Sequence, residues 1–141
     1  MKLYIIRHGE TEWNTEEVFR GRKDVPLNEA GLSQAELTGA FLADKGVDAV
    51  YSSPLVRATQ TAQAICRATG AHLTLDDAFV DMDFGPWEGH ALADVRRRYP
   101  AEFEVWRRAP HRFRMTGAET LAQVLRRIRG GSSVSRLTLP M

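Results

Sequence analysis

Residues 2–14 read K-L-Y-I-I-R-H-G-E-T-E-W-N, and this stretch decides the expected fold class. Residues 2–6 form an apolar run, rich in β-branched and aromatic side chains and without a helical period, which is typical of a buried strand. The strand is expected to end at Arg7 and His8. Because α/β folds place their chemistry where strands end, these two side chains are the first candidates for a functional site.

Downstream of this stretch, helical and extended patterns alternate. Residues 47–51 form a second apolar run that predicts a strand, and Ser53 is a plausible N-cap for a helix with Pro54 at its first position. Gly70 is expected to end that helix, and residues 72–75 to form a third strand. An earlier amphipathic helix is predicted from apolar residues at helical spacing: Leu32, Ala35, Gly39 and Leu42.

The second half of the chain predicts mainly helices. One or two are expected around an interruption at Pro100, and Thr116 with Glu119 predicts a capping box before a last helix. The whole pattern predicts a three-layer α/β/α fold with a mostly parallel central sheet. Residues 1–129 are expected to form the domain, truncated at its C-terminus, and residues 130–141 an atypical, loose tail.

The composition favours a globular protein. The 141 residues are 43% hydrophobic and 26% charged, and no apolar run approaches the roughly 20 residues that span a bilayer. The N-terminus lacks a signal-peptide pattern, and the lone Cys66 cannot form an internal disulfide. We therefore expect a cytoplasmic protein with no membrane partner.

The net charge of +1 hides an uneven distribution. Residues 1–89 carry 8 Lys/Arg against 14 Asp/Glu, whereas residues 90–141 carry 11 against 4. An arginine-rich half could attract nucleic acid. The alternative is that arginines such as those at 96–98 and 126–129 solvate the outer faces of helices. We favour this alternative and expect no nucleic-acid partner.

His8 has the surroundings of a nucleophile. A neutral imidazole can attack phosphorus if its second nitrogen is held by an acceptor and the phosphate charge is neutralised. Arg7 and Arg57 suit the second task, because a guanidinium offers a planar fork of donors and Arg57 would lie in the first turn of a helix. Gly9 would let another group approach closely.

Cleavage of a phosphate ester also needs an acid to protonate the leaving group. Asp81, Asp83 and Glu88 are candidates, and spacing alone does not choose among them. In the same segment Phe84 and Trp87 are interpreted as core residues. The chain lacks clustered metal ligands, and arginine can meet the phosphate charge, so neither a metal nor another cofactor is expected.

Four blocks of the sequence resemble the histidine phosphatase superfamily, also called phosphoglycerate-mutase-like. The blocks span residues 7–14, 24–35, 52–62 and 83–89. The resemblance implies the fold of that family, with His8 as the phosphorylated nucleophile and Arg7 and Arg57 as phosphoryl-binding residues. It also implies that Asn14 and the backbone of Gly21 line the pocket.

Two departures from the family pattern bear on activity. Asp81 stands where the family usually has a glutamate proton donor, and its side chain is one methylene shorter. The family also carries a second histidine before a glycine, after a later strand, and this sequence has none: His72, His90 and His111 are interpreted as surface or loop residues. Loss of one such donor typically lowers the rate on the order of 10² to 10³-fold. The tail after Arg129 resembles a frameshift or truncation product.

The resemblance implies a phosphatase that acts on a small phosphorylated metabolite. Only 27 residues separate Gly89 from Gly117, whereas family mutases carry a long insertion there, so a phosphatase is favoured over a phosphoglycerate mutase. The closest likeness is to α-ribazole phosphatases, which implies α-ribazole 5'-phosphate and cobalamin biosynthesis. The alternative is an impaired remnant that binds phosphate without turnover. A missing strand would expose a sheet edge, which favours a homodimer or aggregation.

Overall fold

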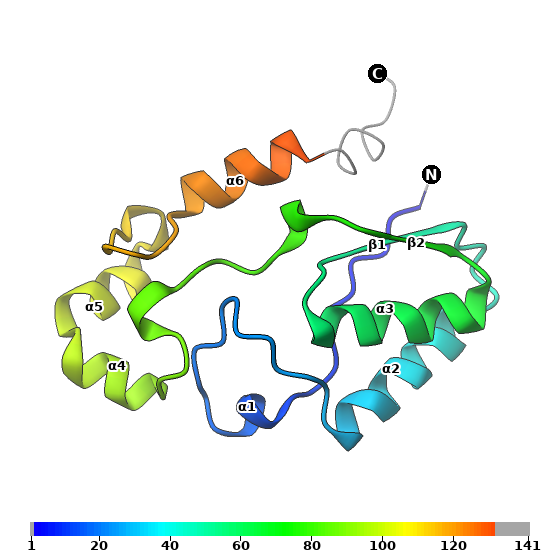
Figure 1. Ribbon diagram of the computed structural model, residues 1–141, viewed down its shortest axis with the longest axis horizontal. Coiled ribbons are helices and arrows are strands. Elements are labelled where there is room, and N and C mark those ends of the chain that lie inside the picture. The colour runs from blue at the N-terminus through cyan, green and yellow to red at the C-terminus, as the bar shows by residue number, and fades with distance from the viewer. Residues whose placement is uncertain (1, 132–141) are drawn as a thin grey trace.

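A computed structural model describes residues 2–131 of the chain (Figure 1). It has a mixed α/β fold with a parallel sheet, as the sequence predicts. The strands are β1 (Ala49–Ser52) and β2 (His72–Leu75), and the α-helices are α1 (Glu12–Thr15), α2 (Glu29–Leu42), α3 (Val56–Thr69), α4 (Leu92–Arg98), α5 (Pro100–Arg108) and α6 (Leu121–Gly130). Short 3₁₀ helices are η1 (Asp77–Phe79), η2 (Gly85–Trp87) and η3 (Pro110–Arg112).

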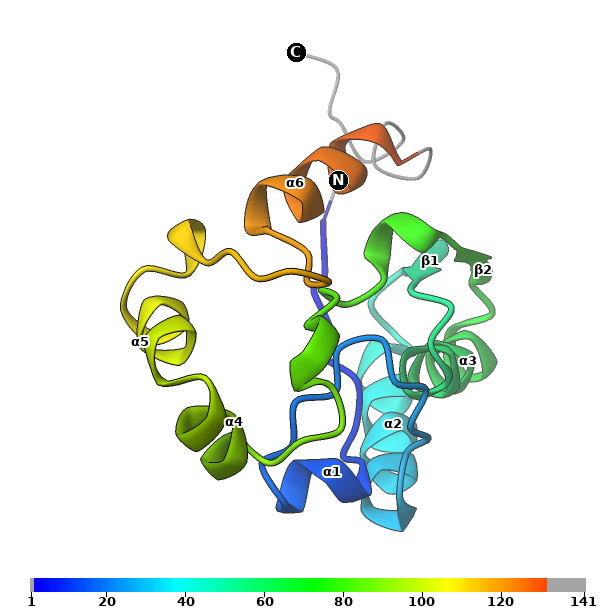
Figure 2. The same cartoon turned by 60° about the vertical axis from the view of Figure 1, so that its left-hand side comes forward.

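The sheet consists of β1 and β2, which pair in parallel from Ala49 opposite His72 to Ser52 opposite Leu75. Helix α3 connects the two strands and packs against both. Two views place α2 and α3 on one side of the sheet and α6 beyond its other side, where α6 contacts η1 and η3 (Figures 1 and 2). This gives the three layers that alternating strands and helices predict.

The prediction of a buried strand at residues 2–6 is wrong: among the described residues, this segment forms no strand. The segment pairs with neither β1 nor β2. Its apolar side chains are exposed to solvent, with Ile5 89% and Leu3 62% exposed. An extended run becomes a strand only when a neighbour takes up its backbone hydrogen bonds. The homodimer or aggregation expected from an exposed sheet edge stays a prediction.

The ends of α2 and α3 follow from local sequence. Asn28 caps α2 by accepting a hydrogen bond from the Gly31 N–H at 2.8 Å. Helix α3 begins at Val56, two residues after the predicted Pro54, and Ser53 is not its N-cap, because the Ser53 hydroxyl accepts from Leu55 N–H at 3.2 Å within the preceding turn. Gly70 ends the helix in a left-handed conformation at φ 74°, as predicted.

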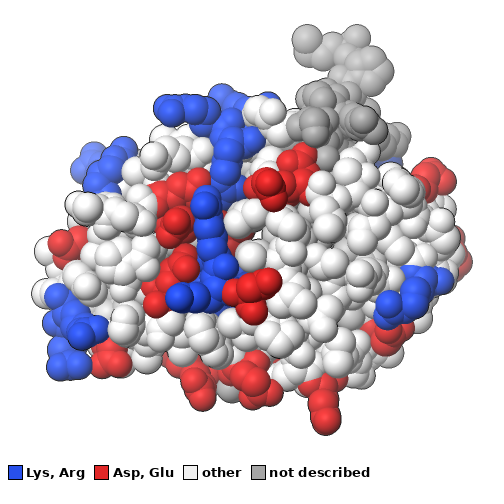
Figure 3. All heavy atoms as spheres, in the orientation of Figure 1, with Lys and Arg blue, Asp and Glu red and all other residues white. Residues whose placement is uncertain are grey.

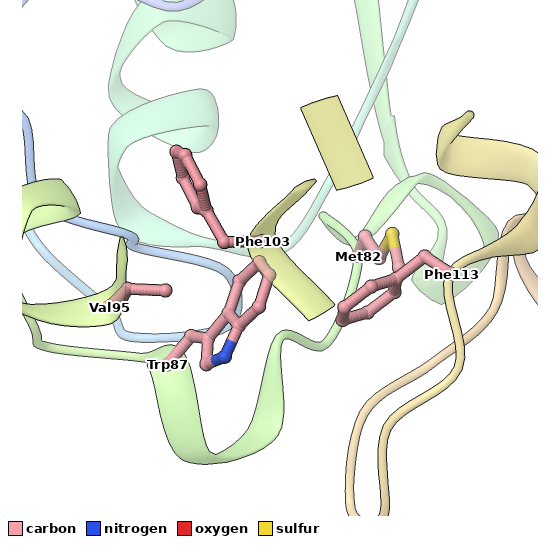
Figure 4. Close-up of a cluster of buried hydrophobic side chains, with 5 residues drawn as sticks. All are labelled: Met82, Trp87, Val95, Phe103 and Phe113. Atoms are coloured by element: carbon pink, nitrogen blue, oxygen red, sulfur yellow. The ribbon is translucent and has the colours of Figure 1, made fainter. Parts of the chain in front are cut away.

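A hydrophobic cluster holds the other half of the molecule together. It consists of Met82, Trp87, Val95, Phe103 and Phe113 (Figure 4). The Trp87 ring is fully buried and lies 4.9 Å from the Phe113 ring, centroid to centroid. Phe84 packs against the same cluster. The interpretation of Trp87 and Phe84 as core residues is confirmed.

The last helix starts later than the capping prediction places it. Thr120, and not Thr116, is the N-cap of α6: its hydroxyl accepts from Gln123 N–H at 3.2 Å, and the Gln123 side chain accepts from Thr120 N–H at 2.8 Å. Glu119 is thereby free for tertiary contacts. The predicted tail begins at residue 130, and residues 132–141 lie outside the described part of the chain.

Charged side chains of both signs are interleaved on the surface. Figure 3 shows a narrow column of Lys and Arg side chains across one face, with Asp and Glu side chains against it. The helical arginines include local ion pairs, such as Arg97 with Asp94 at 3.0 Å. Within residues 2–131, we find no helix with the length and hydrophobicity that a bilayer span requires.

Candidate active site

His8 lies half-buried where the N-terminal segment leads into the α1 loop. Its Nδ1 is 2.7 Å from the carbonyl oxygen of Gly9. Because a carbonyl can only accept, Nδ1 carries the proton in this contact, and the neutral ring keeps the Nε2 lone pair for attack. Burial lowers the pKa of His8, the Gly9 hydrogen bond opposes this, and the charges of Arg57, Arg20 and Arg7 lower it further. The neutral form is therefore favoured at neutral pH.

Gly9 lets the His8 loop pack tightly against α2. A side chain at this position would collide with the backbone of Gly31, as expected for a glycine that permits close approach. The Gly9 N–H donates to the Thr61 hydroxyl at 3.2 Å, and that hydroxyl donates to the Arg57 carbonyl at 2.9 Å. These contacts fix His8 relative to α3, which carries Arg57.

Arg57 is buried in the first turn of α3, with 2% of its side chain exposed. Its Nη1 donates to the Lys23 carbonyl at 2.8 Å and its Nη2 to the Gly21 carbonyl at 2.8 Å. Nη2 also lies 3.3 Å from an Asp81 carboxylate oxygen. Arg57 therefore ties the 21–23 loop to the helix N-terminus, which is a favourable place for an anion.

The structure separates the three candidate acids. Asp81 is half-exposed and pairs with Arg57, while its other oxygen accepts from Met82 N–H at 2.8 Å. Asp83 accepts from Gly85 N–H at 2.8 Å, and Glu88 accepts from the Arg22 N–H at 2.9 Å. Of the three, Asp81 alone lines the cavity that also contains His8, and its role as the acid stays a prediction.

Arg7, His8, Arg57 and Asp81 line one cavity of about 1210 Å³. The cavity continues along residues 2–6, β1 and the start of α3. It brings together the histidine, two arginines and one of the three carboxylates that the sequence singled out. The expected convergence of Arg7 and Arg57 on one anion in front of His8 stays a prediction.

Asn14 and Gly21 shape the loops around the cavity instead of lining it. The Asn14 Oδ1 accepts from both the N–H and the hydroxyl of Thr11, at 2.8 and 2.9 Å. Gly21 is buried with φ +50°, and a side chain there would collide with the Glu88 carboxylate. Its carbonyl holds Arg57. Their expected direct contact with a ligand stays a prediction.

A second ionic cluster, which the sequence did not indicate, holds the loop that carries Asp81. The Arg127 Nε donates to Glu119 at 2.8 Å, its Nη1 to the Ala78 carbonyl at 2.7 Å, and its Nη2 to the Asp81 carbonyl at 3.2 Å. Arg127 therefore does not solvate an outer helix face, as its arginine-rich run suggested. Glu119 also accepts from Asp83 N–H at 3.2 Å. The pair acts on the site by positioning Asp81.

The pKa of Glu119 depends on this ionic cluster. Burial raises the pKa of Glu119, but the hydrogen bonds from Arg127 and Asp83 N–H, with the charges of Arg127 and Arg22, outweigh it, and the pKa is lowered. A carboxylate with a lowered native pKa contributes stability above its unfolded pKa. That stability is lost as the pH falls through the native pKa.

Glu119→Gln is expected to lower the free energy of unfolding by about 1–3 kcal/mol at pH 7, because Arg127 loses a charged, two-point acceptor. The difference from wild type should shrink below pH 4.5, the ordinary pKa of the group. Urea unfolding at several pH values measures both effects. Glu104→Gln is the matched control: it removes exposed pairs with Arg107 and Arg108, and solvent screening should make its effect on the free energy of unfolding much smaller than that of Glu119→Gln. Equal losses in the two variants would contradict this role of Glu119.

Residues 3–133 match the histidine phosphatase superfamily (branch 1), and the chain belongs to this superfamily. Phosphoserine phosphatase 1 of Hydrogenobacter thermophilus is 36% identical over 130 residues, which are 92% of this chain and 62% of the relative. The match confirms the family resemblance of the sequence blocks.

Solved structures agree with this assignment. The mycobacterial glucosyl-3-phosphoglycerate phosphatase Rv2419c, in complex with VO3, superposes with a TM-score of 0.83 at 28% identity, over 92% of this chain and 63% of that one. The α-ribazole phosphatase from Shigella flexneri gives a TM-score of 0.81 at 26% identity, over 94% of this chain and 64% of that one. The chain thus spans less than two thirds of the length of each of these relatives.

Proposed function

We propose that the chain is a phosphomonoesterase that hydrolyses a small phosphate ester through a phosphohistidine at His8. The observation that carries the proposal is the placement of His8: its Nδ1 donates to Gly9, and the ring shares a cavity with Arg7, Arg57 and Asp81. Membership of a phosphatase-containing superfamily supports the same reaction.

The proposed reaction has two steps. The Nε2 of His8 attacks phosphorus, the bond from phosphorus to the ester oxygen breaks, and Asp81, as the general acid, passes a proton to the departing alcohol. Water then attacks the phosphohistidine and gives its proton to Asp81, which releases inorganic phosphate and restores the imidazole. Arg7 and Arg57 neutralise the charge on the phosphoryl oxygens in both steps.

Release of phosphate from p-nitrophenyl phosphate tests the proposal. We expect His8→Ala to lose activity and His72→Ala, at an exposed strand position, to keep it. A phosphohistidine, which is stable in alkali and hydrolysed in acid, should form on the wild type and not on His8→Ala. Its amount should decrease as the pH falls through the lowered pKa of His8, because the protonated imidazole cannot attack phosphorus. Equal release by wild type and His8→Ala would overturn the proposal.

The substrate within this class is proposed from the relatives. α-Ribazole 5'-phosphate is the first candidate, since the Shigella phosphatase bears that name, and phosphoserine is the second, from the Hydrogenobacter relative. A comparison of kcat/KM for the two esters decides between them. Activity on the first would support a role in cobalamin biosynthesis, and a cytoplasmic location is part of the same proposal.

Phosphate binding without turnover is a second candidate function. One observation favours it: among residues 2–131, His8 is the single histidine that lines the cavity. Transition-state charge would then be met by arginine alone. Tight binding of inorganic phosphate, with equal ester cleavage by wild type and His8→Ala, would identify this outcome.

A further inference from the structure

Asp81 lies in a stretch without helix or strand, residues 80–84, between η1 and η2. Its side chain is 48% exposed, so packing does not fix the direction of the carboxylate. The position of such a loop depends on contacts from other elements. Helix α6 supplies them: it contacts η1, directly before this stretch, and lies next to the segment in Figure 1.

Arg127 and Glu119 of the α6 region hold the main chain on both sides of the Asp81 side chain. Arg127 donates to the Ala78 carbonyl at 2.7 Å and to the Asp81 carbonyl at 3.2 Å. The Glu119 carboxylate accepts from the Asp83 N–H at 3.2 Å, and the Glu119 N–H donates to the Asp83 carbonyl at 2.7 Å. Two hydrogen bonds of 2.8 and 3.1 Å join the Arg127 guanidinium to the Glu119 carboxylate. This ionic pair therefore fixes the backbone from residue 78 to residue 83.

The ionic pair is also connected to the loop that holds Arg57. The Arg22 guanidinium lies 3.4 Å from the Glu119 carboxylate. Arg22 belongs to the 21–23 loop, whose carbonyls accept hydrogen bonds from Arg57. Arg57 in turn lies 3.3 Å from the Asp81 carboxylate. A closed chain of contacts thus leads from the Asp81 carbonyl, through the ionic pair and the loop, back to the Asp81 carboxylate.

We propose that Arg127 and Glu119 are positioning residues that keep the Asp81 carboxylate within reach of a leaving alcohol, which suits the site to alkyl phosphates. The inference rests on the proposed function, because Asp81 is the acid of that reaction. A general acid acts only within hydrogen-bond reach of the atom that it protonates. An alkoxide must be protonated as it leaves, whereas a nitrophenolate leaves without a proton. Cleavage of an alkyl ester therefore depends on the placement of Asp81 far more than cleavage of a nitrophenyl ester does.

The dependence of kcat/KM on the leaving group tests the proposal, because kcat/KM covers the steps up to release of the alcohol and excludes hydrolysis of the phosphohistidine. We expect Arg127→Met to lower kcat/KM roughly 10- to 100-fold for the better of two alkyl esters, phosphoserine and α-ribazole 5'-phosphate. With p-nitrophenyl phosphate it should stay nearly unchanged. Arg127→Lys keeps the charge without the planar fork and should restore part of the loss. Glu119→Gln should show the same selectivity, and it serves as the test if Arg127→Met does not fold. Arg126→Gln, at an exposed position of α6, is the control and should act as wild type on both kinds of ester.

A double-mutant cycle with Asp81→Asn shows, without any hydrolysis, whether the ionic pair acts through the Asp81 side chain. Asparagine keeps the main-chain carbonyl but removes the charge that pairs with Arg57. Urea unfolding of Arg127→Met, Asp81→Asn and the double variant measures the coupling. We expect the rise in the unfolding constant of the double variant to be roughly 3-fold or more below the product of the two single effects.

Equal losses of kcat/KM with alkyl and nitrophenyl esters would overturn the inference, because the ionic pair would then stabilise the fold without placing the acid. Additive effects in the unfolding cycle would overturn it too. Hydrolysis by wild type would in either case leave the proposed function standing. If wild type cleaves none of these esters, the proposed function fails, and the unfolding cycle alone decides whether Arg127 positions Asp81.

Discussion

Arg57→Met is expected to abolish measurable binding of inorganic phosphate and to lower the free energy of unfolding by about 2–4 kcal/mol. Methionine fills a similar volume but donates no hydrogen bond. The carbonyls of Lys23 and Gly21 and the carboxylate of Asp81 would lose their shared donor in a buried place. The loss would therefore extend to the 21–23 loop that these carbonyls belong to. Calorimetry and urea unfolding measure the two effects.

Two further variants complete this test: Arg67→Met is a control, and Arg57→Lys separates the charge of Arg57 from its hydrogen bonds. Arg67→Met, on the exposed face of the same helix, should change stability by less than about 0.5 kcal/mol and leave phosphate binding intact. Arg57→Lys keeps the charge but cannot reach both carbonyls with one planar fork, so we expect partial binding and a clear loss of stability. Full stability in Arg57→Met would show that the 21–23 loop does not depend on Arg57.

Elements that depend on neighbouring residues were predictable from the sequence. The strand at His72–Leu75 was predicted with its observed bounds, and Pro100 begins α5 after ending α4, because proline cannot occupy the middle of a helix. Gly70 stops α3 since the left-handed conformation there favours glycine. In each case the cause lies within a few residues of the effect.

Predictions failed for two reasons: the cause lies far away in the chain, or two similar local patterns compete. The pattern at residues 2–6 indicates a strand, yet an apolar run cannot show which segment takes up its hydrogen bonds. Thr116 and Glu119 have the spacing of a capping box, but Thr120 and Gln123 have it too, four residues later, and that alternative forms. A capping pattern alone therefore does not determine at which of two neighbouring positions the helix begins.

The same distinction applies to the site. His8, Arg7, Arg57 and Asp81 could be singled out from motif blocks, and they line one cavity. The contact of Arg127 with the Asp81 carbonyl joins residues 46 positions apart, and no local pattern predicts it.

Trp87→Ala is expected to lower the free energy of unfolding by about 3–5 kcal/mol, because it leaves a cavity in the centre of the aromatic cluster. The Trp87 ring contacts Phe19, Phe103 and Phe113, with centroids 5.0, 6.2 and 4.9 Å away. Met82, in the same cluster, donates its N–H to Asp81. The substitution should therefore also weaken the placement of Asp81.

Trp87→Phe separates packing from hydrogen bonding at this position. The buried Trp87 Nε1 has no hydrogen-bond partner in the part of the chain that the structure describes, and an unpaired buried donor carries a penalty of about 1–3 kcal/mol. Phenylalanine removes that donor and keeps most of the ring contacts, so the smaller cavity and the lost penalty should nearly offset each other. We expect a loss of only about 1 kcal/mol in urea unfolding. A loss as large as that of Trp87→Ala would mean that the indole N–H has a stabilising partner, and the cluster would then not be held by packing alone.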